Sequence, residues 1–170
     1  MGGNALKSVV TKRITTSEFN DISKEIFGRL ELVFEQYAIP RFYKNKQTFG
    51  DIDIVISSIE NINIKEYIQN TFKPNEIFHN GNCWSFDFRE TQIDFIFTKK
   101  SDFDSTVMYM SDSDMGNYIG KIAHGFGLKY SQEGLVYDHY FKGSNIGRVL
   151  LSKDYDKIYN FFGLDYNLSL

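Results

Sequence analysis

Residues 50–56 constrain the fold of this chain more than any other segment, because acidic and aliphatic side chains alternate there. The run reads Gly50-Asp51-Ile52-Asp53-Ile54-Val55-Ile56. Successive side chains of a β-strand point to opposite faces, so Asp51 and Asp53 share one face at a spacing of about 7 Å. The isoleucines share the other face. This pattern predicts a strand with one face in a hydrophobic core and two carboxylates on the other.

A second alternating run, Gln92-Ile93-Asp94-Phe95-Ile96-Phe97, carries a third carboxylate. If the two strands are neighbours, all three carboxylates converge at one edge of the sheet. Adjacent carboxylates repel one another, and keeping them ionised is costly unless a cation lies between them. Mg²⁺ prefers carboxylate and phosphate oxygens. We therefore expect Asp51, Asp53 and Asp94 to hold two Mg²⁺ ions, for which Mn²⁺ can substitute, and to serve phosphoryl transfer.

An Asp-x-Asp pair on a strand is, taken alone, more often a solvent-facing edge than a metal site. The same spacing recurs at Asp102/Asp104 and at Asp112/Asp114. Those two pairs lie in polar segments that resemble loops, whereas Asp51/Asp53 follows a glycine and enters an apolar strand. This context favours the first pair as the metal site.

Periodicity along the rest of the chain predicts an α+β fold with helices on one twisted sheet. The run Thr15-Thr16-Ser17-Glu18 is a capping box, and apolar residues continue at helical spacing through about residue 37. We expect further helices at 62–71, 114–126 and 153–162, strands at 76–80, 83–88 and 92–98, and a hairpin at 127–138. Ser113 and Ser152 are the expected caps of the last two helices. The expected domains are residues 1–107 and 108–170.

Composition excludes several classes of protein. The chain has 170 residues, and its single cysteine cannot form an internal disulfide. Its net charge of −3 argues weakly against nucleic-acid binding, since proteins that bind phosphate backbones are usually basic. The charge is uneven, however: residues 1–50 hold eight Lys and Arg against five Asp and Glu, and residues 51–107 hold five against ten. An acidic middle beside basic residues suits a metal site next to phosphate-binding cations. With no signal peptide or membrane span, we expect a cytoplasmic protein.

These motifs together resemble the nucleotidyltransferase superfamily, and specifically the family X DNA polymerases typified by DNA polymerase beta. Gly50-Asp51-Ile52-Asp53 matches the family's Gly-Asp-x-Asp strand, and Ile93-Asp94-Phe95 matches the strand of its third carboxylate. The resemblance covers about residues 12–166. It implies a polymerase beta-like palm with a mixed sheet and flanking helices, followed by a small α/β C-terminal lobe that binds nucleotide and template.

The C-terminal third continues the resemblance. Tyr109-Met110-Ser111-Asp112-Ser113-Asp114 is similar to the family's Tyr-Phe-Thr-Gly-Ser-Asp segment at the nucleotide pocket. Asn117 matches an Asn that contacts the incoming base, and Lys121 stands where the family has an Arg near the template. A Tyr at position 109 is, without the resemblance, more often a core residue. The nucleotide-binding residues that the resemblance implies are Arg13, Arg41, Lys44, Gly50, Tyr109, Asp114 and Asn117, with Lys121 binding template.

The chain also departs from the family. Pro40-Arg41 replaces the Gly-Ser turn that contacts the triphosphate, and Arg41 and Lys44 can supply positive charge instead. Gln92 replaces an Arg, which we expect to remove a partner that orients Asp94. The family's separate DNA-binding lyase domain has no counterpart. This minimal form is similar to enzymes encoded by phages and large viruses, which act in the host cytoplasm.

The favoured hypothesis is a monomeric gap-filling or repair DNA polymerase. Its partners would be a nucleoside triphosphate and a nucleic-acid primer/template, with DNA favoured over RNA. We expect no membrane partner. A second hypothesis is a non-templated nucleotidyltransferase that modifies RNA ends or a small molecule. A third is a binding module that keeps the fold without activity, which the three intact aspartates argue against.

Overall fold

The computed structural model describes residues 3–58, 62–112 and 114–165, which form two compact units. The N-terminal unit comprises Met1–Ile39 and Lys44–Lys100, and the C-terminal unit comprises Pro40–Tyr43 and Ser101–Leu170. The division along the chain therefore comes earlier than the boundary expected after residue 107. That boundary would cut through helix α3 (Phe103–Met110), which the sequence pattern did not predict.

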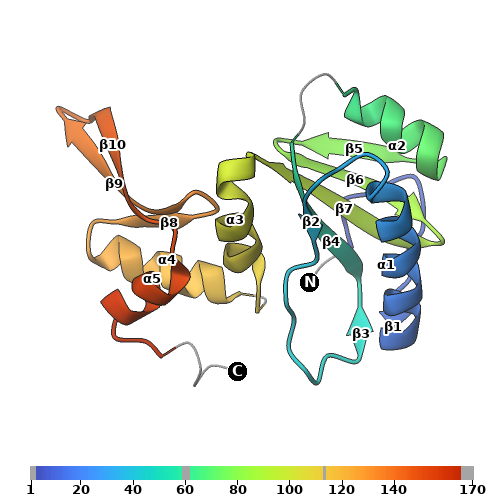
Figure 1. Cartoon of the computed structure of the whole chain (residues 1–170), viewed down its shortest axis with the longest axis horizontal. Helices are drawn as coiled ribbons and strands as arrows, with labels where there is room; N and C mark the ends of the chain where they lie inside the picture. Colours follow the sequence, from blue (N-terminus) through green and yellow to red (C-terminus); the bar gives the residue numbers. More distant parts are fainter. Residues whose placement is uncertain (1–2, 59–61, 113, 166–170) are drawn as a thin grey trace. The chain divides into compact units, whose positions relative to one another are not determined.

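The N-terminal unit is built on a five-stranded sheet in the order β2-β4-β7-β6-β5 (Figure 1). Strands β4 and β7 run parallel and the other neighbouring strands run antiparallel, so the sheet is mixed. The strands are β2 (Tyr37–Ala38), β4 (Asp51–Ser57), β5 (Ile77–Asn80), β6 (Cys83–Phe88) and β7 (Thr91–Thr98). The expected α+β class is confirmed, as are the four expected strands, which are β4, β5, β6 and β7. A small separate sheet pairs β1 (Ile14–Thr15) with β3 (Thr48–Phe49).

Helices α1 (Thr16–Leu30) and α2 (Ile64–Phe72) cover the apolar face of this sheet. The ring of Phe72 packs against Phe86 and Phe95, with centroids 5.1 and 5.7 Å apart. Arg29 of α1 donates a hydrogen bond to the backbone of α2, which joins the two helices. Burial of this face supplies the main stabilisation of the unit, and the carboxylates of β4 and β7 lie on the opposite face.

The first helix begins as predicted and ends early. Thr15 is the N-cap and forms the predicted capping box with Glu18. The expected end near residue 37 is wrong, because the helix stops at Leu30 and Tyr37 lies in β2. Pairing of Tyr37 and Ala38 with β4 requires an extended backbone, so edge-strand pairing outweighs helical periodicity there.

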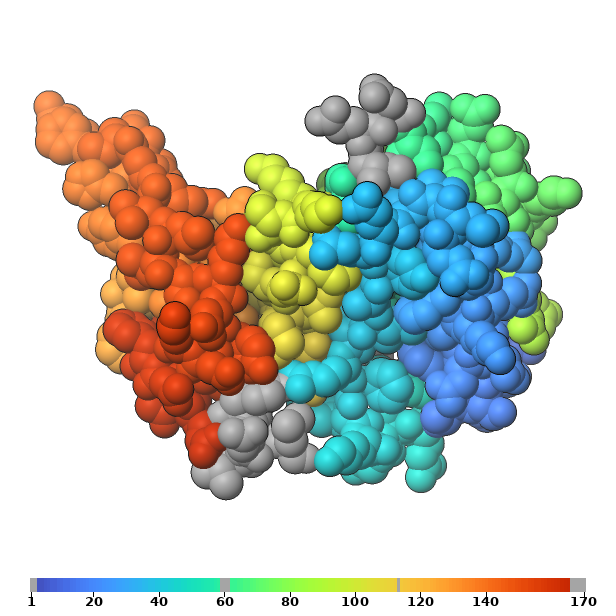
Figure 2. All heavy atoms as spheres, viewed as in Figure 1, coloured from blue at the N-terminus to red at the C-terminus, as the bar shows by residue number. Residues whose placement is uncertain are grey.

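The C-terminal unit packs three helices on a three-stranded antiparallel sheet in the order β10-β9-β8. Its elements are α3, α4 (Met115–Gly125), β8 (Lys129–Ser131), β9 (Gly134–Phe141), β10 (Ser144–Ser152) and α5 (Tyr155–Phe161). The core of this unit contains Ile119, Ala123, Tyr130, Leu135, Ile158 and Tyr159. The predicted hairpin is present as β8 and β9, but β10 was not predicted. The tip of the β9–β10 hairpin extends from the rest of its unit (Figure 2, orange).

Several local predictions in this unit need correction. Asp102 and Asp104 lie at the start of α3 and not in a loop. Asp154 caps α5 by accepting a hydrogen bond from the Lys157 backbone, whereas Ser152 accepts one from the Asp154 backbone. The predicted cap Ser113 lies outside the described residues, and the N-cap of α4 is Asp114.

None of the helices in the described ranges has the length and apolar character that crossing a bilayer requires. The longest of the five, α1, has 15 residues and a capped, partly polar surface. Helices that span a bilayer need about 20 predominantly apolar residues.

The crossing of α3 and α4 depends on Gly116, because a Cβ there would collide with the backbone carbonyl of Tyr109. We predict that Gly116→Ala destabilises the protein by about 2 kcal/mol through forced separation of the two helices. Gly125→Ala is the matched control, since a Cβ at that end of α4 meets nothing within 4 Å. Chemical denaturation measures both variants, and equal stability of the two would contradict the close approach.

Candidate active site

Three carboxylates meet on the polar face of the sheet of the N-terminal unit. In the parallel pairing of β4 with β7, Asp53 lies directly beside Asp94, and Asp51 lies beside Gln92. One oxygen from each of the three carboxylates lies within 4.8 Å of the others. The convergence predicted for Asp51, Asp53 and Asp94 is therefore present, and it follows from strand alternation together with this register.

The electrostatics of this acidic triad, Asp51, Asp53 and Asp94, are unfavourable without a cation. Burial, followed by the negative charges of Asp51 and Asp94, raises the pKa of Asp53 to about 7. Burial also raises the pKa of Asp94, although hydrogen bonds from Ser85 and Gln92 oppose that shift. Crowded carboxylates that resist ionisation are typical of a site that a cation neutralises.

The donor set fits a hard divalent cation. Three carboxylates supply only oxygen ligands, which Mg²⁺ and Mn²⁺ prefer over the nitrogen and sulfur ligands of zinc sites. When bound, such an ion polarises phosphoryl oxygens and lowers the pKa of a bound hydroxyl group.

Gln92 orients Asp94, contrary to the expectation that replacing the family's Arg removes this partner. The Gln92 amide nitrogen lies 3.0 Å from each carboxylate oxygen of Asp94. Its side-chain oxygen accepts a hydrogen bond of 2.9 Å from the backbone N–H of Ala5. Gln92 is 2% exposed, so these are buried contacts with little competition from water.

Strand β6 adds two residues to the polar face that the sequence analysis did not assign. Ser85 lies beside Asp94 in the antiparallel register, and its neighbour Cys83 lies on the same face. Burial, then the charges of Asp94, Asp53 and Asp51, raise the pKa of Cys83 to about 11, so it remains a neutral thiol at physiological pH. The alternation Cys83-Trp84-Ser85-Phe86 was the signal that could have placed both residues on this face.

The predicted phosphate-binding cations divide between the two units. Arg13 lies just before β1 and donates to the backbone oxygen and hydroxyl of Thr48, three residues before Asp51. Lys44 is exposed in the N-terminal unit, and Lys46, which was not predicted, lowers the pKa of Asp53. Arg41 belongs to the C-terminal unit, where its guanidinium pairs with Asp112 at 3.1 Å. Gly50 is partly buried and directly precedes β4.

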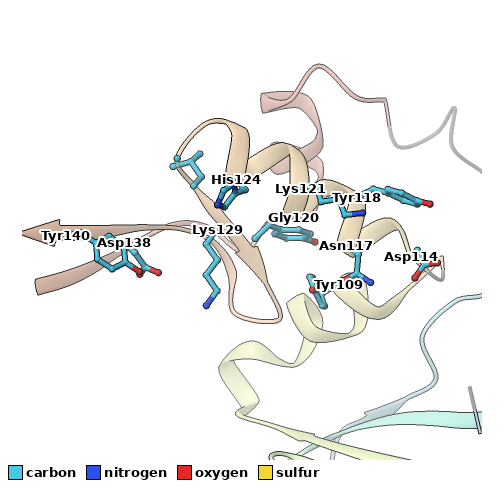
Figure 3. A pocket seen from close by; sticks show the side chains of 13 residues that line it. Tyr109, Asp114, Asn117, Tyr118, Gly120, Lys121, His124, Lys129, Asp138 and Tyr140 are labelled. Atoms are coloured by element: carbon cyan, nitrogen blue, oxygen red, sulfur yellow. Dashed lines mark hydrogen bonds between the residues drawn. The ribbon is translucent and has the colours of Figure 1, made fainter. Parts of the chain in front are cut away.

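The C-terminal unit contains an open cavity of about 1040 Å³. Tyr109, Asp114, Asn117 and Lys121, which the resemblance assigns to nucleotide and template, all line it. Figure 3 shows Tyr109 of α3 and Asn117 of α4 pointing toward one another, and the Tyr109 hydroxyl donates to the Asn117 side-chain oxygen at 3.3 Å. These four residues, which lie on α3, on α4 and between the two helices, thus line one cavity.

The same cavity includes residues that the sequence analysis left unassigned. His124 from α4, Lys129 from β8, and Asp138 and Tyr140 from β9 are among them (Figure 3). Tyr118, which is 55% exposed, lies under the Lys121 ammonium at 5.6 Å from the ring centroid. Aromatic and cationic side chains around one cavity suit a ligand with a planar ring and a negative charge.

Comparison with known proteins does not show a family. No protein-family model matches the chain, and no curated protein sequence matches it. The resemblance to nucleotidyltransferases therefore stays a prediction from residue pattern, and the geometry of the two units is the basis for any proposal about function.

The raised pKa of Asp53 predicts how stability depends on pH in metal-free protein. Between about pH 4 and pH 7 folded Asp53 keeps a proton that unfolded Asp53 releases, so the free energy of unfolding falls as pH rises through this window. A shift of about three pKa units corresponds to at most about 4 kcal/mol. We predict that Asp53→Asn flattens this dependence and is more stable than wild type at pH 8 in EDTA.

Denaturation at pH 4.5 and pH 8 would measure the effect, with Asp104→Asn as the matched control because Asp104 is an exposed member of another Asp-x-Asp pair. Addition of Mn²⁺ at pH 8 should stabilise wild type and Asp104→Asn, and leave Asp53→Asn unchanged. Parallel pH profiles for all three proteins would contradict the electrostatic account.

Proposed function

We propose that the protein is a metal-dependent nucleotidyltransferase that adds a deoxynucleotide to a DNA primer 3′-hydroxyl. The observation that carries the proposal is the convergence of Asp51, Asp53 and Asp94 within 4.8 Å on the polar face of a mixed sheet. The protein-bound cofactor would be two Mg²⁺ ions, with Mn²⁺ as a substitute. The chemical change is formation of a bond from the primer oxygen to the α-phosphorus, with release of pyrophosphate.

The residues of the N-terminal unit divide into ligands and supporting groups. Asp51 and Asp53 would hold the ion that accompanies the triphosphate. Asp94, which Gln92 and Ser85 hold in one orientation, would face the attacking hydroxyl and take up its proton. Arg13 offers a positive charge near the start of β4 for the phosphates.

The cavity of the C-terminal unit supports nucleotide selection as its role. The ring of Tyr109 packs edge-on against Tyr130 with centroids 5.4 Å apart, so its position is constrained. The constrained Tyr109 side chain, hydrogen-bonded to Asn117, can contact the sugar and the minor-groove edge of a base, which matches the roles that the resemblance implies. Lys121 would lie near the template strand.

One observation favours the alternative of a non-templated transferase that acts on RNA ends or a small molecule. The Pro40-Arg41 segment stands where the family has its Gly-Ser turn, yet Arg41 is engaged by Ser111 and Asp112 of the C-terminal unit. The triphosphate contact that the Gly-Ser turn makes in the family is therefore not supported for Pro40-Arg41.

Primer extension on one-nucleotide-gapped DNA with Mg²⁺ or Mn²⁺ tests the proposal. We expect wild type and Asp104→Asn to add the templated nucleotide, and Asp53→Asn to be slower by more than about a hundredfold, the scale on which one electrostatic stabiliser acts. Addition of ribonucleotides to single-stranded RNA, with none to gapped DNA, would select the alternative. Equal extension by wild type and Asp53→Asn would refute the proposed metal centre.

The nucleotide role of the cavity predicts a binding defect in Tyr109→Phe. This change removes the hydrogen bond to Asn117 and keeps the ring contact with Tyr130. One neutral hydrogen bond contributes about 0.5–1.5 kcal/mol, so KM for the nucleotide should rise about two- to tenfold with kcat nearly unchanged. Tyr118→Phe, in the same cavity, is the matched control and should leave KM unaltered. Steady-state kinetics with a saturating gapped primer measures both.

A further inference from the structure

The N-terminal segment, residues 3–9, contacts the beginnings of both strands that carry the acidic triad. Gly3 adopts a φ of +86°, and a Cβ there would collide with the carbonyl of Gly50, which directly precedes β4. Two residues later, the Ala5 N–H donates to Gln92, the second residue of β7. Leu6, which follows, is 8% exposed and anchors the segment in the core. The segment therefore joins β4 and β7 at the end where the carboxylates lie.

Glu76 holds the other end of the segment. Its carboxylate accepts hydrogen bonds from the backbone N–H groups of Lys7, Ser8 and Val9, at 2.9, 2.7 and 3.1 Å. These hydrogen bonds, of which the one from Lys7 has the largest effect, hold the pKa of Glu76 below its usual range. The Glu76 backbone N–H in turn donates to Asp87 of β6 at 2.8 Å. The segment is thus bound to the sheet through three successive N–H groups and one carboxylate.

The Ala5 N–H selects one orientation of the Gln92 amide. Because a backbone N–H can only donate, it must face the side-chain oxygen of Gln92, which leaves the NH₂ group facing Asp94. A flipped amide would place its oxygen against the Asp94 carboxylate and its NH₂ against the Ala5 N–H, so both contacts would become repulsive. The backbone of the segment thereby determines which group Asp94 meets.

We propose that residues 3–9 act as a positioning segment, anchored by Glu76, that fixes Gln92 and so presents the Asp94 carboxylate to the divalent cation. Glu76 and Gln92 are positioning residues, since neither belongs to the acidic triad. This inference rests on the proposed metal site. It adds that cation affinity depends on a residue in the loop before β5 and on a backbone N–H near the start of the chain.

The decisive experiment is a double-mutant cycle that measures Mn²⁺ affinity by calorimetry and the EPR spectrum of the bound ion. Gln92→Met keeps the side-chain length and removes both hydrogen bonds, and it should weaken Mn²⁺ binding about tenfold or more. Glu76→Ala should weaken Mn²⁺ binding by a smaller factor, about threefold to tenfold. If the segment acts through Gln92, adding Glu76→Ala to Gln92→Met should have no further effect. Both single variants should show the same altered EPR line shape.

Two controls separate positioning from general stability. Glu90→Ala breaks a surface ion pair with Lys12, just beyond the segment, and should leave Mn²⁺ affinity unchanged. Glu76→Asp retains the carboxylate and should restore most of the affinity lost in Glu76→Ala. Wild-type Mn²⁺ affinity in Glu76→Ala, or additive losses in the double variant, would overturn the proposal.

A second variant avoids dependence on any one charged side chain. Gly3→Ala must displace Gly50 or the segment, whereas Gly81→Ala has a similar positive φ of +61° and open space around it. Gly3→Ala should lower Mn²⁺ affinity and Gly81→Ala should not; equal affinities would count against the proposal.

If wild type and Asp53→Asn bind Mn²⁺ alike, the metal site itself is wrong and the inference falls with it. If only Asp53→Asn loses binding, the metal site stands and the positioning role is refuted.

Discussion

The repulsion among three carboxylates at the β4–β7 pair is the constraint on which the rest of the N-terminal unit depends. Parallel pairing places Asp53 beside Asp94, and alternation adds Asp51 on the same face. Burial of the opposite face by α1 and α2 keeps the two strands in this register, because a slip by one residue would move Ile52 and Ile54 out of the core. The hydrophobic core therefore stabilises an arrangement of charge that is unfavourable by itself, as expected where a cation completes the site.

The polar groups around the acidic triad are arranged to limit that cost. Gln92 and Ser85 donate to Asp94, and Asp87 and Glu76 extend the network to the N-terminal segment. The N–H groups of Ala5, Gln92 and Glu76 in this network each have an acceptor at 3.0 Å or less, which makes the network rigid as well as satisfied. Different contacts stabilise the C-terminal unit: α3 and α4 approach closely at Gly116, and the ring of Tyr109 packs against that of Tyr130.

The sequence was sufficient to predict those features that depend on local periodicity. Alternation located Asp51, Asp53 and Asp94, and the capping box located the start of α1. What it missed depends on partners far along the chain. The Ala5–Gln92 contact joins residues 87 positions apart through a backbone N–H, which has no residue signature. Helix α1 ends early because β2 is needed at the sheet edge, and the largely exposed β10 shows no clear alternation of burial to reveal it.

The central claim is that the acidic triad binds divalent cations, and an anomalous-scattering map from crystals soaked in Mn²⁺ tests it most directly. We predict an anomalous peak within coordination distance of carboxylate oxygens from Asp51, Asp53 and Asp94 together, and no such peak in crystals of Asp53→Asn. A wild-type map with no peak at these three carboxylates, or with Mn²⁺ bound only elsewhere on the protein, would contradict the account.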